Sequence, residues 1–152
     1  MIYCYGSVLP TAKQNGGSQM NFLDKITEEK AFLLNPVVLA FVGDAVYSLY
    51  VRESLAVTVD KKSGVLSEMA AKVVRAESQA KKADALAEFF NERETAVFLR
   101  ARNAKKNTRA KHSSISEYHK STGFEAVLGY LYLSGQTERL DSILHYGEND
   151  ER

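Results

Sequence analysis

The sequence has a single cysteine and no long apolar run, and each shortage excludes a class of protein. Cys4 alone cannot form an intramolecular disulfide or a cysteine-based metal site, so we expect a reducing, cytoplasmic environment. No apolar run reaches the roughly 20 residues that a membrane-spanning helix needs, and the first residues lack the pattern of a secretory signal. The 152 residues therefore predict one soluble domain without membrane association.

The net charge of +1 hides an uneven distribution of charge along the chain. Residues 100–120 contain one acid, Glu117, and seven basic residues, namely Arg100, Arg102, Lys105, Lys106, Arg109, Lys111 and Lys120. The remaining chain holds 13 basic and 18 acidic residues, so this one segment carries the positive field. Such a segment can bind a polyanion, although a solvated charged surface is the more common outcome.

Residues 1–19 differ in composition from the rest of the chain. They are rich in Gly, Ser, Gln and Asn and show no apolar periodicity, which predicts a mobile tail. Residues 20–152 are predicted to form the folded domain, and Met20 is the candidate start of the functional chain.

The sequence pattern of residues 20–152 predicts one helix after another. Few segments alternate apolar and polar residues as a strand does, so we expect an all-α fold. Asn35 and Pro36 form a strong start signal, because asparagine caps a helix and proline suits its first position. Ser116 is the expected cap of the longest C-terminal helix, after a polar, basic loop at 105–116. The expected helices cover residues 21–33, 36–55, 63 or 67 to 75, a segment ending near 90, 91–104, 116–133 and 137–146.

The segment 36–51 carries one charge, Asp44. Its apolar residues repeat at helical spacing in a stripe made of Val38, Phe41, Val42, Ala45 and Leu49. The positions around Asp44 also offer no counter-ion, since they are Val37, Ala40, Ser48 and Val51. We therefore predict that this helix is central in the core and that Asp44 is a buried carboxylate.

The segment 121–136 also carries one charge, Glu125. This acid lies at the edge of a second apolar stripe, which consists of Phe124, Val127, Leu128 and Leu131. Burying a lone carboxylate is costly unless it is paired or binds a cation.

Glycines beside the two acids predict that the two helices cross closely. Gly43 precedes Asp44, and Glu125 is flanked by Gly123 and Gly129. A close crossing would bring the two acids together. Their like charges would repel each other unless a divalent cation lay between them, and Mg²⁺ prefers hard ligands such as carboxylate oxygens. Either acid alone would favour a structural ion pair, whereas the two together favour a metal site.

Two motifs resemble the catalytic domain of the ribonuclease III family. Phe41-Val42-Gly43-Asp44-Ala45 matches the core of the family's signature helix, and Glu125-Ala126 with Gly129 matches a later helix of pattern Asp-x-x-Glu-Ala. The resemblance covers about residues 30–146, with no room after it for a double-stranded-RNA-binding domain. With RARNAK at 100–105 and YxxSTxFEA at 118–126, the chain resembles the shortened branch called Mini-ribonuclease III.

Two positions depart from the family pattern. The family has a glutamate four residues before the signature aspartate, where this chain has Ala40. It has an aspartate three residues before the later glutamate, where this chain has Thr122. Only two of the four usual acids remain, so water and RNA phosphate are expected to fill more of the metal's coordination shell.

The resemblance implies a Mg²⁺-dependent endoribonuclease that hydrolyses double-stranded RNA, with Asp44 and Glu125 as catalytic and metal-binding residues. It also implies a homodimer with one site per subunit and precursor 23S ribosomal RNA as substrate. One alternative is a catalytically silent scaffold of the same fold that binds RNA on the ribosome. Another is a helical dimer that binds only protein.

The basic segment is expected to bind RNA phosphates because it directly precedes the helix of Glu125 and because A-form duplexes are read mainly by shape and phosphates. The expected RNA-binding residues are Arg100, Arg102, Lys105, Lys106, Arg109 and Lys111. A weaker second stripe consists of Lys72, Arg75, Gln79 and Lys82, and it could equally be a water-facing surface paired with Glu68. No metal-ligand spacing relates His112, His119 and His145.

Overall fold

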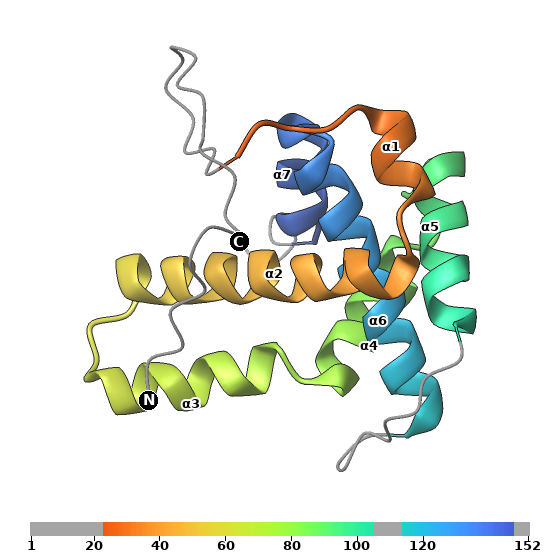
Figure 1. Ribbon diagram of the computed structural model, residues 1–152. Helices are drawn as coiled ribbons and strands as arrows, with labels where there is room; N and C mark the ends of the chain where they lie inside the picture. The colour runs from red at the N-terminus through yellow and green to blue at the C-terminus, as the bar shows by residue number, and fades with distance from the viewer. Residues whose placement is uncertain (1–22, 105–113, 148–152) are drawn as a thin grey trace, which may run out of the picture.

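The structure of the chain, a computed structural model, describes residues 23–104 and 114–147. Within these ranges every regular element is a helix, which confirms the all-α prediction. In chain order the helices are α1 (Glu28–Leu33), α2 (Pro36–Thr58), α3 (Ser63–Val73), α4 (Ala76–Leu86), α5 (Glu92–Asn103), α6 (Ile115–Leu133) and α7 (Thr137–Leu144) (Figure 1). None of these helices is long and apolar enough to cross a membrane. The predicted tail at 1–19 lies outside the described residues.

Helix α6 is the centre of the fold. Its residues 121–124 and 126–131 are buried, and α2, α4 and α5 pack around it. Figure 1 shows α6 passing behind α2, with its N-terminal half below α2 and its C-terminal half above, beside α7. The predicted stripe of α6 is confirmed, because its four residues are fully buried, namely Phe124, Val127, Leu128 and Leu131.

Capping residues explain where two of the main helices begin. The Asn35 side chain accepts a hydrogen bond from the Val37 amide at 2.8 Å, as the start signal predicts. Helix α6 begins earlier than predicted, because Ser114 rather than Ser116 is its cap. Glu117, three residues after Ser114, accepts a hydrogen bond from the Ser114 amide at 2.8 Å and closes a capping box.

The other helix ends differ from the predicted ones by a few residues. Helix α1 begins only at Glu28, because the Thr27 side chain caps it. Helix α2 continues beyond the predicted end at 55 to Thr58, and α4 ends at Leu86 instead of near 90. Helix ends lack the packing constraints that fix helix interiors, so sequence patterns place them less accurately.

The side of helix α2 that faces the core differs from the predicted side. Phe41 is 80% exposed, Leu49 59% and Val38 48%, so the predicted core stripe faces outward. The prediction was wrong because α2 is apolar on nearly all sides, and periodicity alone cannot select a face of such a helix. The side with the small residues faces α6, and the buried residues are Leu39, Ala40, Gly43, Tyr47 and Val51. We call the exposed residues Val38, Phe41, Ala45 and Leu49 the outer face of α2.

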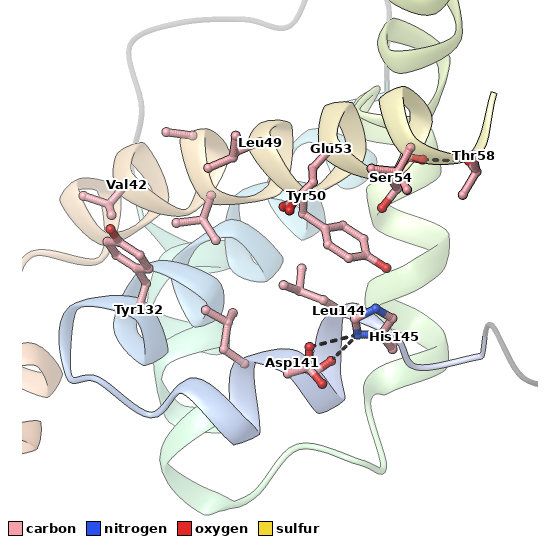
Figure 2. Close-up of a pocket in the computed structure, with 14 residues that line it drawn as sticks. Val42, Leu49, Tyr50, Glu53, Ser54, Thr58, Tyr132, Asp141, Leu144 and His145 are labelled. Atoms are coloured by element: carbon pink, nitrogen blue, oxygen red, sulfur yellow. Dashed lines mark hydrogen bonds and ion pairs between the residues drawn. The ribbon is translucent and has the colours of Figure 1, made fainter. Parts of the chain in front are cut away.

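An apolar groove runs along one flank of α2, between this helix and α7 (Figure 2). Its volume is about 950 Å³, and α2 lines it with residues that include Val42, Val46 and Tyr50. Tyr132, from the C-terminal half of α6, also lines the groove and lies beside Val42 in Figure 2. Helix α7 and the end of α6 thus occupy this flank, which leaves the opposite flank to the N-terminal half of α6.

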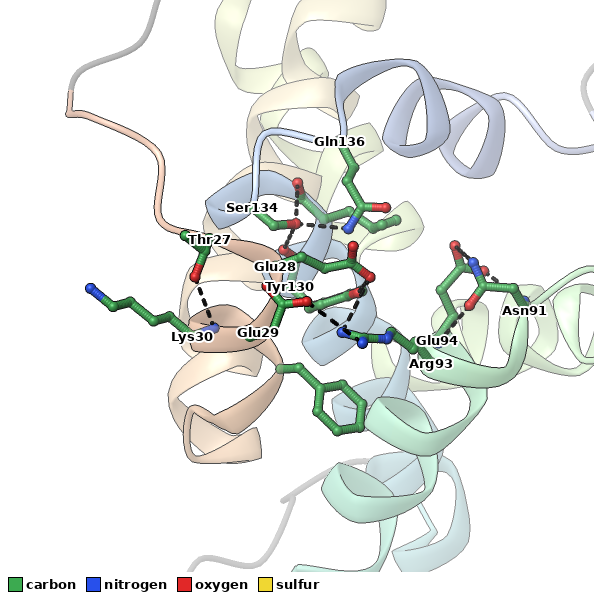
Figure 3. Close-up of polar contacts among 12 residues, drawn as sticks. Thr27, Glu28, Glu29, Lys30, Asn91, Arg93, Glu94, Tyr130, Ser134 and Gln136 are labelled. Carbon is green, nitrogen blue, oxygen red and sulfur yellow. Dashed lines mark hydrogen bonds and ion pairs between the residues drawn. The ribbon is translucent and has the colours of Figure 1, made fainter.

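Polar contacts tie the peripheral helices together around α6 (Figure 3). The Tyr130 hydroxyl of α6 donates to Glu28 of α1 at 2.7 Å, and burial followed by this hydrogen bond raises the pKa of Tyr130. Arg93 of α5 lies 3.4 Å from the same carboxylate. The fully buried Glu94 of α5 pairs with Arg139 of α7 at 2.7 and 2.8 Å. These pairs fix α1, α5 and α7 relative to one another and to α6.

Candidate active site

Helices α2 and α6 cross with their backbones in contact. A Cβ added to Gly43 would lie 1.7 Å from the carbonyl oxygen of Glu125, and one added to Gly129 would lie 2.0 Å from that of Leu39. These distances exclude any side chain larger than hydrogen at both glycines. The close crossing predicted from Gly43 and Gly129 is therefore confirmed, and it places Asp44 and Glu125 where the two helices meet.

The third glycine has a different role from the predicted one. A Cβ on Gly123 would lie 2.6 Å from the ring of Phe98 in α5, so this glycine makes room for α5 and not for α2. The sequence around Gly123 carries no signal that distinguishes the two roles, because both need only the absence of a side chain.

Asp44 and Glu125 differ in their exposure. Asp44 is exposed, and its side chain makes no hydrogen bond or ion pair with any other described residue, whereas Glu125 is half-buried. The prediction of a buried Asp44 was wrong for the same reason as the predicted core stripe, since α2 is rotated about its axis. Its exposure leaves the Asp44 carboxylate accessible to an ion or a substrate from solvent.

Helix geometry indicates that the two acids lie on the same side of the helix crossing. Successive helix residues are rotated by about 100°, so Asp44 lies on the flank of α2 opposite Val42, which lines the groove with Tyr132. The N-terminal half of α6 therefore leaves the crossing on the flank of Asp44. Because helical side chains lean toward the N-terminus of their helix, Glu125 leans toward the same flank. From this helix geometry we expect the two carboxylates to face one region of the surface.

No third acid joins this pair among the residues that the structure describes. Ala40 is buried, and Thr122 is buried with its hydroxyl donating to the carbonyl oxygen of Tyr118 at 3.0 Å. Across 23–104 and 114–147 there is no group of three or more His, Cys, Asp or Glu side chains that could hold a metal. Two hard carboxylate oxygens nevertheless suit Mg²⁺, which usually binds one or two protein carboxylates and keeps several waters.

Arg100, predicted to bind RNA, has structural partners. Its guanidinium donates to the carbonyl oxygens of Phe32 at 2.8 Å and Leu34 at 3.1 Å, and it lies over the Phe32 ring. These carbonyls end α1, so Arg100 joins α5 to the connection between α1 and α2. We therefore assign Arg100 to the fold and leave it out of the RNA-binding set.

The remaining predicted RNA contacts lie at or beyond the end of α5. Arg102 is half-buried and donates to the Asn103 side chain at 3.2 Å, while its carbonyl oxygen accepts from Nδ1 of His119 at 2.6 Å. This hydrogen bond joins the end of α5 to the beginning of α6, on either side of the basic segment. Four further predicted contacts lie outside the described residues, namely Lys105, Lys106, Arg109 and Lys111.

The second basic stripe predicted on α3 and α4 is not a continuous surface. Lys82 donates to the carbonyl oxygen of Leu144 at the end of α7, and Gln79 is buried with its amide bound to the carbonyl oxygen of Val74. Only Lys72 and Arg75 of the stripe are exposed. Helical spacing shows which residues share a face and not which neighbour covers that face, so the partners of Gln79 and Lys82 were not predictable from it.

The outer face of α2 is the feature that sequence reasoning missed. An apolar helix exposes Phe41 and Leu49 beside an apolar groove. A signal was present in the sequence, because a helix that is apolar on nearly all sides must bury its second face in something other than its own core.

Comparison with known proteins identifies the family. The Ribonuclease III domain family matches residues 37–136. A Mini-ribonuclease 3 of Thermoanaerobacter sp. (strain X514) is 42% identical over 130 residues, which cover 84% of this chain and 92% of that protein. A Mini-ribonuclease 3 of Staphylococcus aureus is 39% identical over 125 residues, which cover 81% and 93%. The crystal structure of a Fusobacterium nucleatum protein has the same fold, with a TM-score of 0.71 at 23% identity over 84% of this chain and 100% of that one.

The matched range contains the whole helix crossing, including Asp44 and Glu125. The two named relatives match over nearly their full lengths, so the similarity is not confined to one motif. The chain therefore belongs to the ribonuclease III family, in its Mini-ribonuclease 3 branch, and is a ribonuclease.

Proposed function

We propose that this ribonuclease is a Mg²⁺-dependent endonuclease of double-stranded RNA, with Asp44 and Glu125 as its metal-binding and catalytic carboxylates. The observation that supports this proposal best is the backbone contact between Gly43, the residue before Asp44, and Glu125. Mg²⁺ bound there would lower the pKa of a coordinated water and offset the charge that develops on the scissile phosphate.

The two acids would contribute differently to such a site. Glu125 is half-buried on the central helix, where contact with Gly43 fixes its backbone, so its carboxylate has a limited range of positions. Asp44 is exposed and can reach a ligand that arrives from solvent. A rigid ligand beside an accessible one is a suitable arrangement for a cation that must also contact RNA.

RNA phosphates would be bound by Arg102 together with Lys105, Lys106, Arg109 and Lys111. In the sequence these residues directly precede α6, the helix that carries Glu125. Phosphate contacts position a duplex without reading its sequence. That the RNA is precursor 23S ribosomal RNA in a bacterial cytoplasm rests on family analogy alone.

A homodimer would cover the outer face of α2. Phe41 and Leu49 are exposed on the outer face, and Ala45 and Leu49 of this face also line the groove, so one apolar surface follows α2. A second copy related by a two-fold axis would bury the same surface on both chains. Asp44 lies on the flank away from the groove, which allows each subunit to keep its site open and to cut one strand.

The test is cleavage of labelled RNA with and without Mg²⁺. A duplex and its separated strands are incubated with the chain, and gel electrophoresis follows the products. We expect internal cuts in the duplex alone, only with Mg²⁺, and none by Asp44→Asn or Glu125→Gln. A chain that binds the duplex but never cuts it would instead be a catalytically silent RNA-binding scaffold. The presence of Ala40 and Thr122 in place of two usual family acids is also consistent with this alternative.

A further inference from the structure

The groove between α2 and α7 carries an uncompensated negative charge. No lysine or arginine is among the described residues that line it, and its acids are Glu53 and Asp141. Asp141 has a neighbour, because Nδ1 of His145 lies 3.2 Å from its carboxylate. Glu53 is exposed and makes no ion pair with any other described residue. Figure 2 shows these acids away from the end of the groove that Val42 forms.

A cation stands at that other end of the groove. Nζ of Lys25 lies 3.5 Å from the centre of the Tyr132 ring, and Tyr132 lines the groove beside Val42. Burial lowers the pKa of this half-buried lysine. In the part of the chain that the structure describes, no carboxylate pairs with Lys25. Its ammonium is therefore partly removed from water without a counter-ion in the single chain.

The two uncompensated charges occupy different ends of one apolar surface. Val42 and Glu53 lie about 16 Å apart along α2, at about 1.5 Å per residue. A second copy can approach this surface with its α2 antiparallel or parallel. The antiparallel arrangement brings the Lys25 end of each copy against the Glu53 end of the other, whereas the parallel one faces like charges. Facing like charges are unfavourable across an interface, so the charges select the antiparallel arrangement.

The apolar residues of α2 fit the same register. If Val42 lies opposite Glu53 of the second copy in an antiparallel pair, then Val38 lies opposite Val57 of the second copy. Val38 is 48% exposed and Val57 81% in the single chain, and Val57 lines the groove. The register that pairs the charges would therefore also bury exposed apolar side chains from both ends of α2.

We propose that Lys25 and Glu53 form reciprocal ion pairs between two copies of this chain, and that these pairs hold the two α2 helices antiparallel. The inference rests on the proposed function, since it takes the second copy from the proposed homodimer. A two-fold axis makes each pair twice, with Lys25 of either copy beside Glu53 of the other. Charge pairs of this kind determine register and partner choice more than affinity. The apolar surface of α2 thus provides association, and the charges provide its orientation.

Charge reversal tests this contact by sedimentation equilibrium over a range of protein concentrations. Lys25→Glu and Glu53→Lys should each raise the dissociation constant of the dimer by about 100-fold, which is about tenfold for each of the two contacts. In an equimolar mixture of these two variants, the mixed dimer has both contacts between opposite charges. At a concentration where each variant alone is monomeric, the mixture should therefore have the mass of a dimer. A variant that had lost its fold could not be restored by mixing.

Control variants reverse a charge away from the groove. Lys30→Glu in α1 and Glu92→Lys in α5 change exposed residues of helices that do not line it, so each should associate like the parent chain. A mixture of Lys25→Glu with the parent chain should associate less tightly than the parent alone. Tighter association in that mixture would indicate parallel helices and overturn the inference.

Two further results would overturn the inference. One is a parent dimer that neither reversal weakens, and the other is a pair of weakened variants whose mixture stays monomeric. Both outcomes leave the proposed homodimer standing, because the parent chain is measured in the same experiment. A parent chain that is monomeric at every concentration would remove the homodimer together with this inference. Cleavage of duplex RNA by the parent chain is scored separately and tests the nuclease activity alone.

Discussion

Gly43 of α2 lies directly against the backbone of Glu125 in α6, so that a Cβ on this glycine would come within 1.7 Å of the Glu125 carbonyl oxygen. The residue after Gly43 is one candidate ligand, and Glu125 is the other. The same contact that packs the two central helices thus also determines where both carboxylates stand.

Gly43→Ala should destabilise the fold strongly. The added methyl group meets backbone that cannot move without separating α2 from α6, so the cost should exceed the about 1–3 kcal/mol typical of overpacking. Gly64→Ala is the matched control, because a Cβ there meets nothing within 4 Å. Thermal unfolding of both variants checks this, and we expect Gly64→Ala to gain about 0.5–1 kcal/mol from the helix preference of alanine. Equal melting temperatures for the two variants would show that the helices are not in backbone contact.

Asp44→Asn and Glu125→Gln should each lower the cleavage rate by more than about 100-fold, because changes that merely orient metal ligands already cost about 10- to 100-fold. Asp44 has no ion pair among the described residues, so Asp44→Asn should leave the melting temperature unchanged. Asp60→Asn serves as the control for loss of one exposed negative charge. A marked fall in melting temperature for either site variant would indicate that the acid has a structural role.

Changing Lys105, Lys106, Arg109 and Lys111 together to Ala should weaken RNA binding. Each phosphate contact adds about 0.7–0.9 to the slope of log affinity against log salt, so the slope should flatten by up to about 3. Binding over a salt series, with Ca²⁺ in place of Mg²⁺, measures this change. The Michaelis constant should rise more than the turnover number falls, because the metal ligands are retained.

Arg100→Ala provides the contrast to the variant in which Lys105, Lys106, Arg109 and Lys111 are all changed to Ala. It leaves the carbonyl oxygens of Phe32 and Leu34 without their donor, so it should cost about 1–3 kcal/mol of folding stability. The slope of its log RNA affinity against log salt concentration should stay near that of the parent chain. If Arg100→Ala instead flattens the slope and leaves stability intact, this arginine contacts RNA after all.

Phe41→Glu should convert a dimer to monomers, because it places a charge in the centre of the outer face of α2. Phe41 is 80% exposed in the single chain, so the substitution should not lower the stability of the monomer fold. Light scattering after size-exclusion chromatography measures the mass of each form. Ile115→Glu is the control, since Ile115 is 73% exposed at the first residue of α6. A parent chain that is already monomeric at micromolar concentration would contradict the proposed dimer.

Residues 1–19 should be dispensable for folding and for cleavage. Their composition has too few periodic apolar residues to offset the entropy lost on ordering. A chain that starts at Met20 should therefore match the full chain in melting temperature and in cleavage rate. A loss of several degrees on truncation would show that this segment packs on the domain.

Much of the fold could be read from local signals. Asn35 with Pro36, and the repeat of Phe124, Val127, Leu128 and Leu131, depend on interactions within one or two helical turns, and the structure confirms both. The close crossing at Gly43 was also predictable, because a glycine in a helix is costly unless a neighbour needs its space.

The environment of the candidate site was less predictable. Periodicity assigned Val38 and Phe41 to the core and Asp44 to an apolar interior, and all three are exposed. Arg100 was read as part of a charge run, whereas Phe32 and Leu34, more than 60 positions earlier, provide its partners. Such contacts depend on how distant segments pack, and one stretch of sequence does not contain that information.

The sequence by itself determined that the chain is helical, that two helices carry one acid each, and that glycines mark the place where those helices meet. These features are local, because they follow from propensity, capping and the size of single side chains. Tertiary structure decided which side of α2 faces α6, how exposed Asp44 is, and that Arg100 belongs to the fold. The reason is that a helix apolar on nearly all sides has several faces of similar burial energy, and only the backbone contact at Gly43 and Gly129 selects one of them.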